Sequence, residues 1–454
     1  MVTTDFHSVS EIYTIEKSAS AEENLTTIKR NRSCTPQEPL WAYNPYGTNR
    51  NSMYVYFKTS GNCYLRYTVS VKDSSIGDFT RTAYTGGQAV TKEHEYQITG
   101  LVAGQTNYII MNLYNSDDEL SETRVFSVDI PQSPSGAANQ LSTKKGTSKK
   151  TITNGLYVVF QNSNEILLYD NSGVLRGEIP VEGNYARNME QIYDTMAYAS
   201  GQNKIVQVNY LGQVTKVHTL GGYKQSGEFK YDGSGNIYVI ATANGKKTTP
   251  KSKVLRITVE NSALKEVVNM DTLLKSVYNK ETKKGKKKNL DWIGLDSLEV
   301  VGTNQLLLSS KNLSSIFKVS SIGSLMPKLN YIIADKDIYK KYSSRLQKKL
   351  LTKYESESAE ATEEPVTNIL KTPKKKDPFI SFFGPATISY KKKGEGKYTL
   401  KVFSAKAGNS AKGNGKSYYL NYEVDEVEGT YDLKKKYAVA QTLADGNYNL
   451  ENEQ

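Results

Sequence analysis

The stretch Lys204-Ile-Val-Gln-Val-Asn-Tyr-Leu-Gly212 decides the fold, because it is a short apolar strand pattern that ends in a turn and recurs along the chain. Four further copies of this phrase, the last one looser, begin at Glu165, Lys253, Ser315 and Ser417. A second strand pattern precedes every copy, over residues 155–160, 195–199, 235–241, 304–310 and 397–403. Self-similar units at an interval of roughly 40 to 50 residues are typical of the blades of a β-propeller.

These repeats predict an all-β chain whose residues 151–454 form a six-bladed β-propeller. A sixth copy of the preceding strand begins in Ala444-Asp-Gly-Asn-Tyr-Asn-Leu450, close to the end of the sequence. The sixth blade is then either completed by another segment or incomplete.

Residues 38–131 predict a second β domain ahead of the repeats. Short alternating runs separated by turn signals recur there, over residues 52–57, 63–69, 95–101, 107–113 and 124–130. Such spacing is typical of a β-sandwich of the immunoglobulin or fibronectin kind. We expect regular structure to begin at Trp41, with residues 1–37 as a polar N-terminal arm and residues 132–150, which are rich in Pro, Ser, Gly and Lys, as a linker.

A helical insertion is expected within the propeller, at about residues 335–378. Apolar residues at helical spacing over 335–351, with Asp335 or Asp337 as the N-cap, predict one helix on the rim of the propeller. The glutamates between Glu355 and Glu364 have no core-forming residue among them, so a mobile loop is expected there.

The charge balance is basic, with 59 Lys and Arg against 47 Asp and Glu and a net charge of +12. Lysines gather in short bursts at 283–288, 374–376, 391–393 and 434–436, each beside turn-forming residues. Solvated loop tips explain these bursts, and the alternative is contact with a polyanion or a cell surface.

Most metal and cofactor chemistry is excluded by composition. Two cysteines, Cys34 and Cys63, allow at most one disulfide and no four-ligand zinc site. The three histidines, His7, His94 and His218, are expected in surface or structural roles, and no glycine-rich phosphate loop or nucleophile elbow occurs. No metal and no cofactor is therefore expected.

No apolar run approaches the roughly 18 residues of a membrane span, and the first thirty residues lack the apolar core of a signal peptide.

Two motifs carry a resemblance to a known family. Asp291-Trp-Ile-Gly-Leu-Asp-Ser297 and the following residues 309–319, Ser-Ser-Lys-Asn-Leu-Ser-Ser-Ile-Phe-Lys-Val, resemble the Asp-Trp-x-His-x-Asn-Ser and Ser-Ser-Arg-His motifs of bacterial aryl-sulfate sulfotransferases. Phe383-Gly-Pro-Ala-Thr387 is similar, more weakly, to their Tyr-Gly-Gln-His-Ala motif. Together with Asn44-Pro-Tyr-Gly47 and the order of sandwich and propeller, the resemblance covers about residues 40 to 450.

The resemblance implies a two-step transfer without a nucleotide sulfate donor. In this family a neutral imidazole attacks the sulfur of a phenolic sulfate, holds the sulfuryl group covalently and passes it to an acceptor phenol. Further His, Asn and Arg side chains in the central channel stabilise the charge on the sulfuryl oxygens and on the departing phenolate.

This sequence departs from the family pattern at the catalytic positions. The motif histidine and asparagine fall on Gly294 and Asp296, the arginine and histidine of the next motif fall on Lys311 and Asn312, and the nucleophile falls on Ala386. Alanine has no lone pair that could take a sulfuryl group, and the Asp296 carboxylate repels a sulfate ester.

These departures favour a pseudoenzyme, which is a non-catalytic binding or surface module of the family. The alternative is an active aryl-sulfate sulfotransferase. We expect a candidate binding site, for a small phenolic or anionic ligand, where Asp291, Trp292, Asp296, Lys311, Asn312 and Ala386 meet at the mouth of the channel. For Asp291 and Trp292 the alternative is simple packing in a blade corner. The resemblance implies an extracytoplasmic or cell-surface location if a leader precedes the given sequence, and the oligomeric state stays open.

Overall fold

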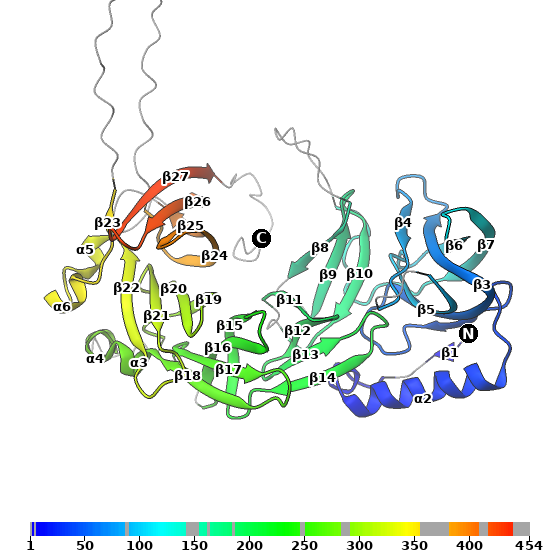
Figure 1. The fold of residues 1–454 in the computed structure, drawn as a ribbon, viewed down its shortest axis with the longest axis horizontal. Coiled ribbons are helices and arrows are strands. Elements are labelled where there is room, and N and C mark those ends of the chain that lie inside the picture. Colours follow the sequence, from blue (N-terminus) through cyan, green and yellow to red (C-terminus); the bar gives the residue numbers. More distant parts are fainter. Residues whose placement is uncertain are drawn as a thin grey trace, which may run out of the picture. The chain divides into compact units, whose positions relative to one another are not determined.

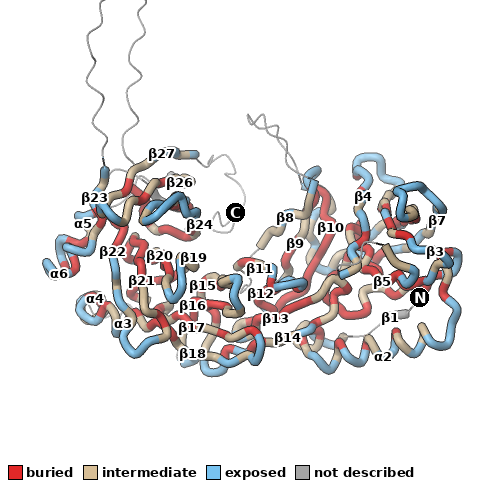
Figure 2. The backbone as a smooth tube through the Cα atoms, in the orientation of Figure 1, coloured by how far each residue is buried: buried red, intermediate tan, exposed pale blue. Residues whose placement is uncertain are grey.

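The structure is a computed structural model that describes residues 2–3, 6–86, 90–141, 154–160, 164–183, 187–245, 250–282, 291–354, 381–407 and 416–438. The chain divides into two units, Met1–Gly221 and Gly222–Glu451, and each is described by itself. Strands dominate both units, so the prediction of an all-β fold is confirmed (Figure 1). In Figure 2 the buried positions run along the strands, whereas many of the turns between them are exposed.

The first unit begins with a seven-stranded sheet in the order β1-β2-β3-β6-β7, to which β4 and β5 add by pairing with β3. Its strands are β1 (Val2–Thr3), β2 (Leu40–Tyr43), β3 (Ser52–Val71), β4 (Phe79–Thr82), β5 (Thr91–Thr99), β6 (Thr106–Tyr114) and β7 (Leu120–Asp129). Strand β3 is 20 residues long and pairs with β5 through its first part and with β6 through its second. The expected runs at 52–57 and 63–69 are therefore two halves of one strand. Buried side chains from both halves, including Phe57 and Leu65, share one core.

Regular structure begins well before Trp41, so that expectation is wrong. Two helices, α1 (Val9–Ile12) and α2 (Ile15–Asn31), precede the sandwich. Thr14 caps α2 by accepting a hydrogen bond from the Lys17 backbone N–H at 3.3 Å. Ala21 and Leu25 are buried against the sandwich residues Leu40, Tyr46 and Tyr54, and Ser18 accepts a hydrogen bond from the Val214 backbone N–H at 3.0 Å. Because this buried stripe is narrow and partly polar, the amino-acid sequence of the segment is polar overall.

Two small antiparallel sheets complete the first unit. The first sheet has three strands, β8 (Leu156–Phe160), β9 (Glu165–Asp170) and β10 (Leu175–Pro180). The second has four strands, β11 (Met189–Ile192), β12 (Thr195–Gly201), β13 (Lys204–Val208) and β14 (Val214–Thr219). Within the expected linker, Gln140 forms a β-bridge with Val174 beside β10. The part of the linker from 142 to 150 lies outside the described residues.

The second unit holds three more sheets. The first four-stranded sheet contains β15 (Tyr223–Tyr231), β16 (Asn236–Ala243), β17 (Lys253–Thr258) and β18 (Leu264–Asn269). The second contains β19 (Leu295–Gly302), β20 (Gln305–Ser310), β21 (Ser315–Ser320) and β22 (Lys328–Ala334). The last sheet has the order β23-β27-β26-β25-β24 and contains β23 (Thr352–Lys353), β24 (Pro385–Gly394), β25 (Lys397–Ala407), β26 (Lys416–Asp425) and β27 (Thr430–Ala438).

The repeat phrase and the strand before it form an antiparallel pair in every sheet after the sandwich. The pairs are β8 with β9, β12 with β13, β16 with β17, β20 with β21 and β25 with β26. The described residues thus contain five small sheets of the propeller type. The strand expected at 444–450 lies outside the described residues, so the sixth blade stays a prediction.

The helical insertion differs from the single helix expected. Residues 335–351 form two short helices, α5 (Lys336–Tyr339) and α6 (Ser344–Gln347), because Ser343 takes an extended conformation between them. Asp335 is the N-cap of α5 and accepts a hydrogen bond from the Asp337 backbone N–H at 3.0 Å. Two further helices after β18, α3 (Met270–Leu273) and α4 (Lys275–Thr282), were not expected. The acidic tract at 355–364 lies outside the described residues.

Two of the lysine bursts lie in strands and correct the expectation of turns. Residues 391–393 belong to β24, which is an edge strand, and residues 434–436 belong to β27. Lysines on an edge strand hinder pairing with another chain. The bursts at 283–288 and 374–376 lie outside the described residues. Within the described parts of the chain, no helix is long and apolar enough to cross a membrane.

Candidate functional site

The site is built in the second unit by β15, β19 and β24, which are edge strands of three successive sheets. Strands β15 and β24 both contact β19. Between β15 and β19 the approach is so close that a Cβ on Gly227 would lie 2.5 Å from the Asp296 carbonyl oxygen. Between β24 and β19, the Ile388 backbone N–H donates to the Ser297 hydroxyl at 2.9 Å.

The two family-like motifs meet at the corner where β19 begins and β20 ends. The Asn312 side-chain amide donates to the Asp291 carbonyl at 2.6 Å, and the Lys311 backbone N–H donates to the Gly294 carbonyl at 2.9 Å. One Asp291 carboxylate oxygen accepts hydrogen bonds from the backbone N–H groups of Gly294 at 3.0 Å and Lys251 at 3.1 Å. Asp291 thus organises the backbone of the corner.

Gly294 lies directly against the Asn312 side chain. Its φ of +56° lies in the left-handed region, and a Cβ on it would lie 2.7 Å from the Asn312 side-chain nitrogen. Any side chain at this position would strain the backbone and displace Asn312. Glycine at 294 and asparagine at 312 therefore fit one another.

Trp292 belongs to the hydrophobic core. It is fully buried, makes an edge contact with Tyr278 at 5.8 Å and donates its indole N–H to the Asp271 carboxylate at 2.7 Å. The structure thus gives the Trp292 side chain a packing role in this core.

Charged side chains gather where β15 faces β19. Asp296 and Lys311 form an ion pair at 3.4 Å, and both are largely buried. On β15, burial and, after it, the negative charge of Asp296 raise the pKa of Glu228 from its ordinary value of 4.5 to about 8. A second pair, Lys230 with Glu299 at 3.8 Å, joins the same two strands. This arrangement combines the carboxylates of Asp296 and Glu299 with two lysine ammonium groups and with a Glu228 carboxyl group whose raised pKa favours the protonated form.

Ala386 lies on β24 and is fully buried. The segment before it is held by hydrogen bonds from the Gly384 backbone N–H to the Ser314 hydroxyl at 3.1 Å and from the Phe383 backbone N–H to the Ser404 hydroxyl at 2.9 Å. This position is thus close to the end of β20 and the turn after it, but it presents only a methyl group.

The buried histidines are committed to other contacts in the first unit. Burial lowers the pKa of both His94 and His218 to about 4. His94 is within hydrogen-bonding distance of Tyr96, Thr59 and Cys63, and His218 bonds with Gln207 at 2.7 Å. The two cysteines are free and buried. The described residues contain no group of three or more His, Cys, Asp or Glu side chains that could hold a metal ion.

Two protein-family models match the chain. The model described as "Arylsulfotransferase (ASST)" matches residues 141–442, and the model described as "Arylsulfotransferase Ig-like domain" matches residues 40–130. The chain belongs to the arylsulfotransferase family. The resemblance seen in the sequence is thereby confirmed, and the sandwich is the Ig-like domain of this family.

Other comparisons add little about this arylsulfotransferase-family chain. No curated protein matches it. Among solved structures, the N-terminal domain of Nup159 is similar over 62% of this chain and 57% of that domain, with 9% identity and a TM-score of 0.27, so the chain spans less than two thirds of it. A catalytically inactive virginiamycin B lyase from Staphylococcus aureus matches over 61% of this chain and 88% of its own, with 12% identity and a TM-score of 0.27. BamB from Moraxella catarrhalis matches over 81% and 88%, with 10% identity and a TM-score of 0.25. TM-scores this low do not establish a shared function.

The candidate positions of the arylsulfotransferase motifs are mostly brought together. Asp291, Gly294, Lys311 and Asn312 share one corner, Asp296 pairs with Lys311, and Ala386 lies on the neighbouring strand. Glu228 was not among the predicted site residues. The resemblance puts the paired histidines of the family near Ser226 and Gly227, directly before Glu228, but the effect of this glutamate depends on β15 lying beside β19, which no local pattern shows.

Proposed function

We propose that this arylsulfotransferase-family protein is a non-catalytic binding module that has kept the family scaffold. The observation that carries this proposal is the fit of Gly294 against Asn312: a side chain at position 294, such as the histidine of the family motif, would take a left-handed φ and would displace the Asn312 side chain. The motif alignment also assigns the nucleophile to Ala386, which has no group that could accept a sulfuryl group.

The charges of the site support a ligand that differs from an aryl sulfate. Asp296 and Glu228 place two carboxyl groups near the position where the family motifs provide donors for sulfuryl oxygens. Lys311 retains a positive charge there, but it lies beside Asp296 at 3.4 Å and lacks the planar, bidentate donors of arginine. A carboxylate acceptor such as Asp296 suits a neutral phenol, whose hydroxyl donates a hydrogen bond, better than it suits an anion.

Turnover of a chromogenic aryl sulfate with phenol as acceptor tests this function. We expect no release of the chromophore above the uncatalysed rate, while an active family member assayed in parallel turns over. Titration calorimetry with phenol and with phenyl sulfate tests the ligand, and we expect phenol to bind more tightly. Asp296→Asn should reduce this preference, because it removes a negative charge from the site. Turnover comparable to the active member would instead support an aryl-sulfate sulfotransferase with other catalytic residues.

A further inference from the structure

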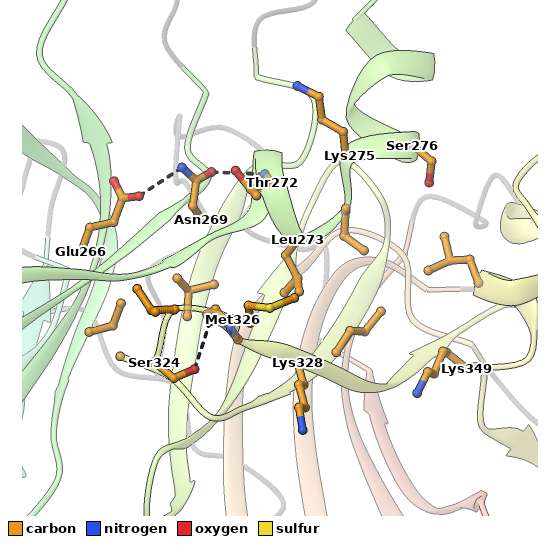
Figure 3. A pocket seen from close by; sticks show the side chains of 18 of the residues that line it. Glu266, Asn269, Thr272, Leu273, Lys275, Ser276, Ser324, Met326, Lys328 and Lys349 are labelled. Atoms are coloured by element: carbon orange, nitrogen blue, oxygen red, sulfur yellow. Dashed lines mark hydrogen bonds between the residues drawn. The ribbon is translucent and has the colours of Figure 1, made fainter.

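A large groove in the second unit lies away from the candidate site. It has a volume of about 1210 Å³ and is bounded by β18, the turn between β21 and β22, and the helices α3 and α6 (Figure 3). All of its described lining residues belong to the second unit.

The floor of the groove is apolar. Val267, Val268, Leu274 and Leu346 line it and are buried or nearly so. Figure 3 shows Leu273 and Met326 in the middle of the view, between the polar side chains at the edges. A floor of this kind binds aliphatic side chains by removing them from water.

Two apolar side chains at the mouth are exposed although they are large. Leu325 is 102% exposed and Met326 is 78% exposed. Their turn is nevertheless fixed, because the Lys265 ammonium donates to the Gly323 carbonyl at 2.7 Å and the Met326 backbone N–H donates to the Ser324 hydroxyl at 3.2 Å. Exposed apolar residues at the edge of an apolar groove mark an interaction surface.

The rim of the groove is strongly basic. Five cationic side chains line it against a single carboxylate: Lys265, Lys275, Lys328, Arg345 and Lys349 against Glu266. Glu266 already accepts hydrogen bonds from the Tyr223 hydroxyl and the Asn269 side-chain amide, both at 3.0 Å. Within the described residues, none of the five cations takes part in an ion pair, unlike many other lysines of the chain.

We propose that this groove binds an acidic peptide segment of another protein that carries apolar side chains on one face. The apolar side chains contact the floor together with Leu325 and Met326, and the carboxylates face the five rim cations. Charge complementarity selects the acidic segment, and the apolar floor selects a peptide over a simple polyanion. Nucleic acid is disfavoured because none of the described lining residues is aromatic, which leaves no platform for base stacking.

Fluorescence anisotropy with the full chain tests the proposal. The probe is a labelled synthetic peptide of about 15 residues with leucines at helical i, i+3, i+4 and i+7 spacing and glutamates at the other positions. Two control peptides carry glutamine in place of glutamate, or serine in place of leucine. We expect the probe to bind and each control peptide to bind at least about tenfold more weakly, with affinity for the probe falling as salt rises.

Paired variants locate the binding. Leu325→Ser with Met326→Ser, and separately Lys328→Glu with Lys349→Glu, should each weaken binding by about tenfold or more. The matched controls are Val427→Ser, which changes an apolar residue that is 75% exposed in the turn after β26, and Lys391→Glu with Lys392→Glu in β24. These controls should stay within about twofold of the unchanged protein. All substituted residues are exposed or at the mouth, so each variant should also unfold at the same urea concentration.

Three results would overturn the proposal. The first is no binding of the probe, and the second is equal weakening by the groove variants and their matched controls. The third is displacement of the probe by anionic lipid vesicles or by a single-stranded oligonucleotide, with binding of either competitor lost in the groove variants. That result would assign the groove to a membrane surface or to nucleic acid.

Discussion

At the scale of single residues, the candidate site depends on how Gly294 and Asn312 fill one small space. The sequence motifs predict which positions form the candidate site, because tryptophan, aspartate and serine residues occur around them at the spacing of the family motifs. They do not reveal the left-handed φ of Gly294 or the 2.7 Å approach of its neighbour. Those facts depend on how the corner of β19 packs on the end of β20.

The first prediction concerns restoring a histidine at position 294. Gly294→His should lower the free energy of unfolding by about 2 kcal/mol or more, because it combines a strained backbone with a steric clash. Adding Asn312→Ala should recover part of this loss. Urea unfolding measures both, with Gly394→His as the control, since a Cβ on Gly394 meets nothing within 4 Å. Wild-type stability in Gly294→His would show that the corner is looser than described.

The second prediction concerns the pH dependence caused by Glu228. Its pKa is raised to about 8, so the folded protein holds this proton more tightly than the unfolded chain. The resulting stability is fully present below pH 4.5 and is lost as the pH rises through about 8. Glu228→Gln should remove a loss on the order of 4 kcal/mol between about pH 5 and about pH 9.

Urea unfolding across this pH range provides the measurement for Glu228→Gln. The exposed residue Glu260 supplies the control, because Glu260→Gln should leave the pH profile unchanged. If both variants follow the wild-type profile, the carboxyl group of Glu228 is not shielded from water as the structure indicates.

At the scale of elements, the strands were more predictable than the helices. The repeat phrases combine alternating apolar residues with glycine or asparagine at the turns, and these two signals together place β12 with β13 and β16 with β17. Helix α2 was missed because its buried stripe consists of Ser18, Ala21 and Leu25, of which only Leu25 is a large apolar residue. Such a helix owes its position to tertiary contacts, which a local pattern does not contain.

The third prediction concerns this helix. Leu25 is 1% exposed in α2, so Leu25→Ala should lower the free energy of unfolding by about 2 to 4 kcal/mol. Ile15→Ala in the same helix should cost less than about 1 kcal/mol, because Ile15 is 42% exposed. Equal, small effects of both variants in thermal or urea unfolding would contradict this prediction. They would indicate that residues 1–37 form a loosely attached arm.

At the scale of the whole molecule, the residues that hold the fold together differ from the residues of the candidate site. The family models cover residues 40–130 and 141–442, so the order of Ig-like domain and repeated sheets follows from sequence patterns spread over the chain. The sheets are held by buried strand residues such as Ile205, Val206 and Leu308, none of which belongs to the candidate site. The fold can therefore persist when the residues of the site change, and the site must be judged by its own chemistry.

The most direct test of the proposed non-catalytic function is intact-mass spectrometry after incubation with an aryl sulfate. A family enzyme that works through a covalent intermediate gains the mass of one sulfuryl group as phenol is released. For this chain we predict no mass gain and no release of phenol, both in the unchanged protein and in Ala386→His, because the other donors of the site remain replaced. A stable sulfuryl adduct on any residue of the second unit, formed together with phenol release, would contradict the account and assign sulfotransferase activity to this protein.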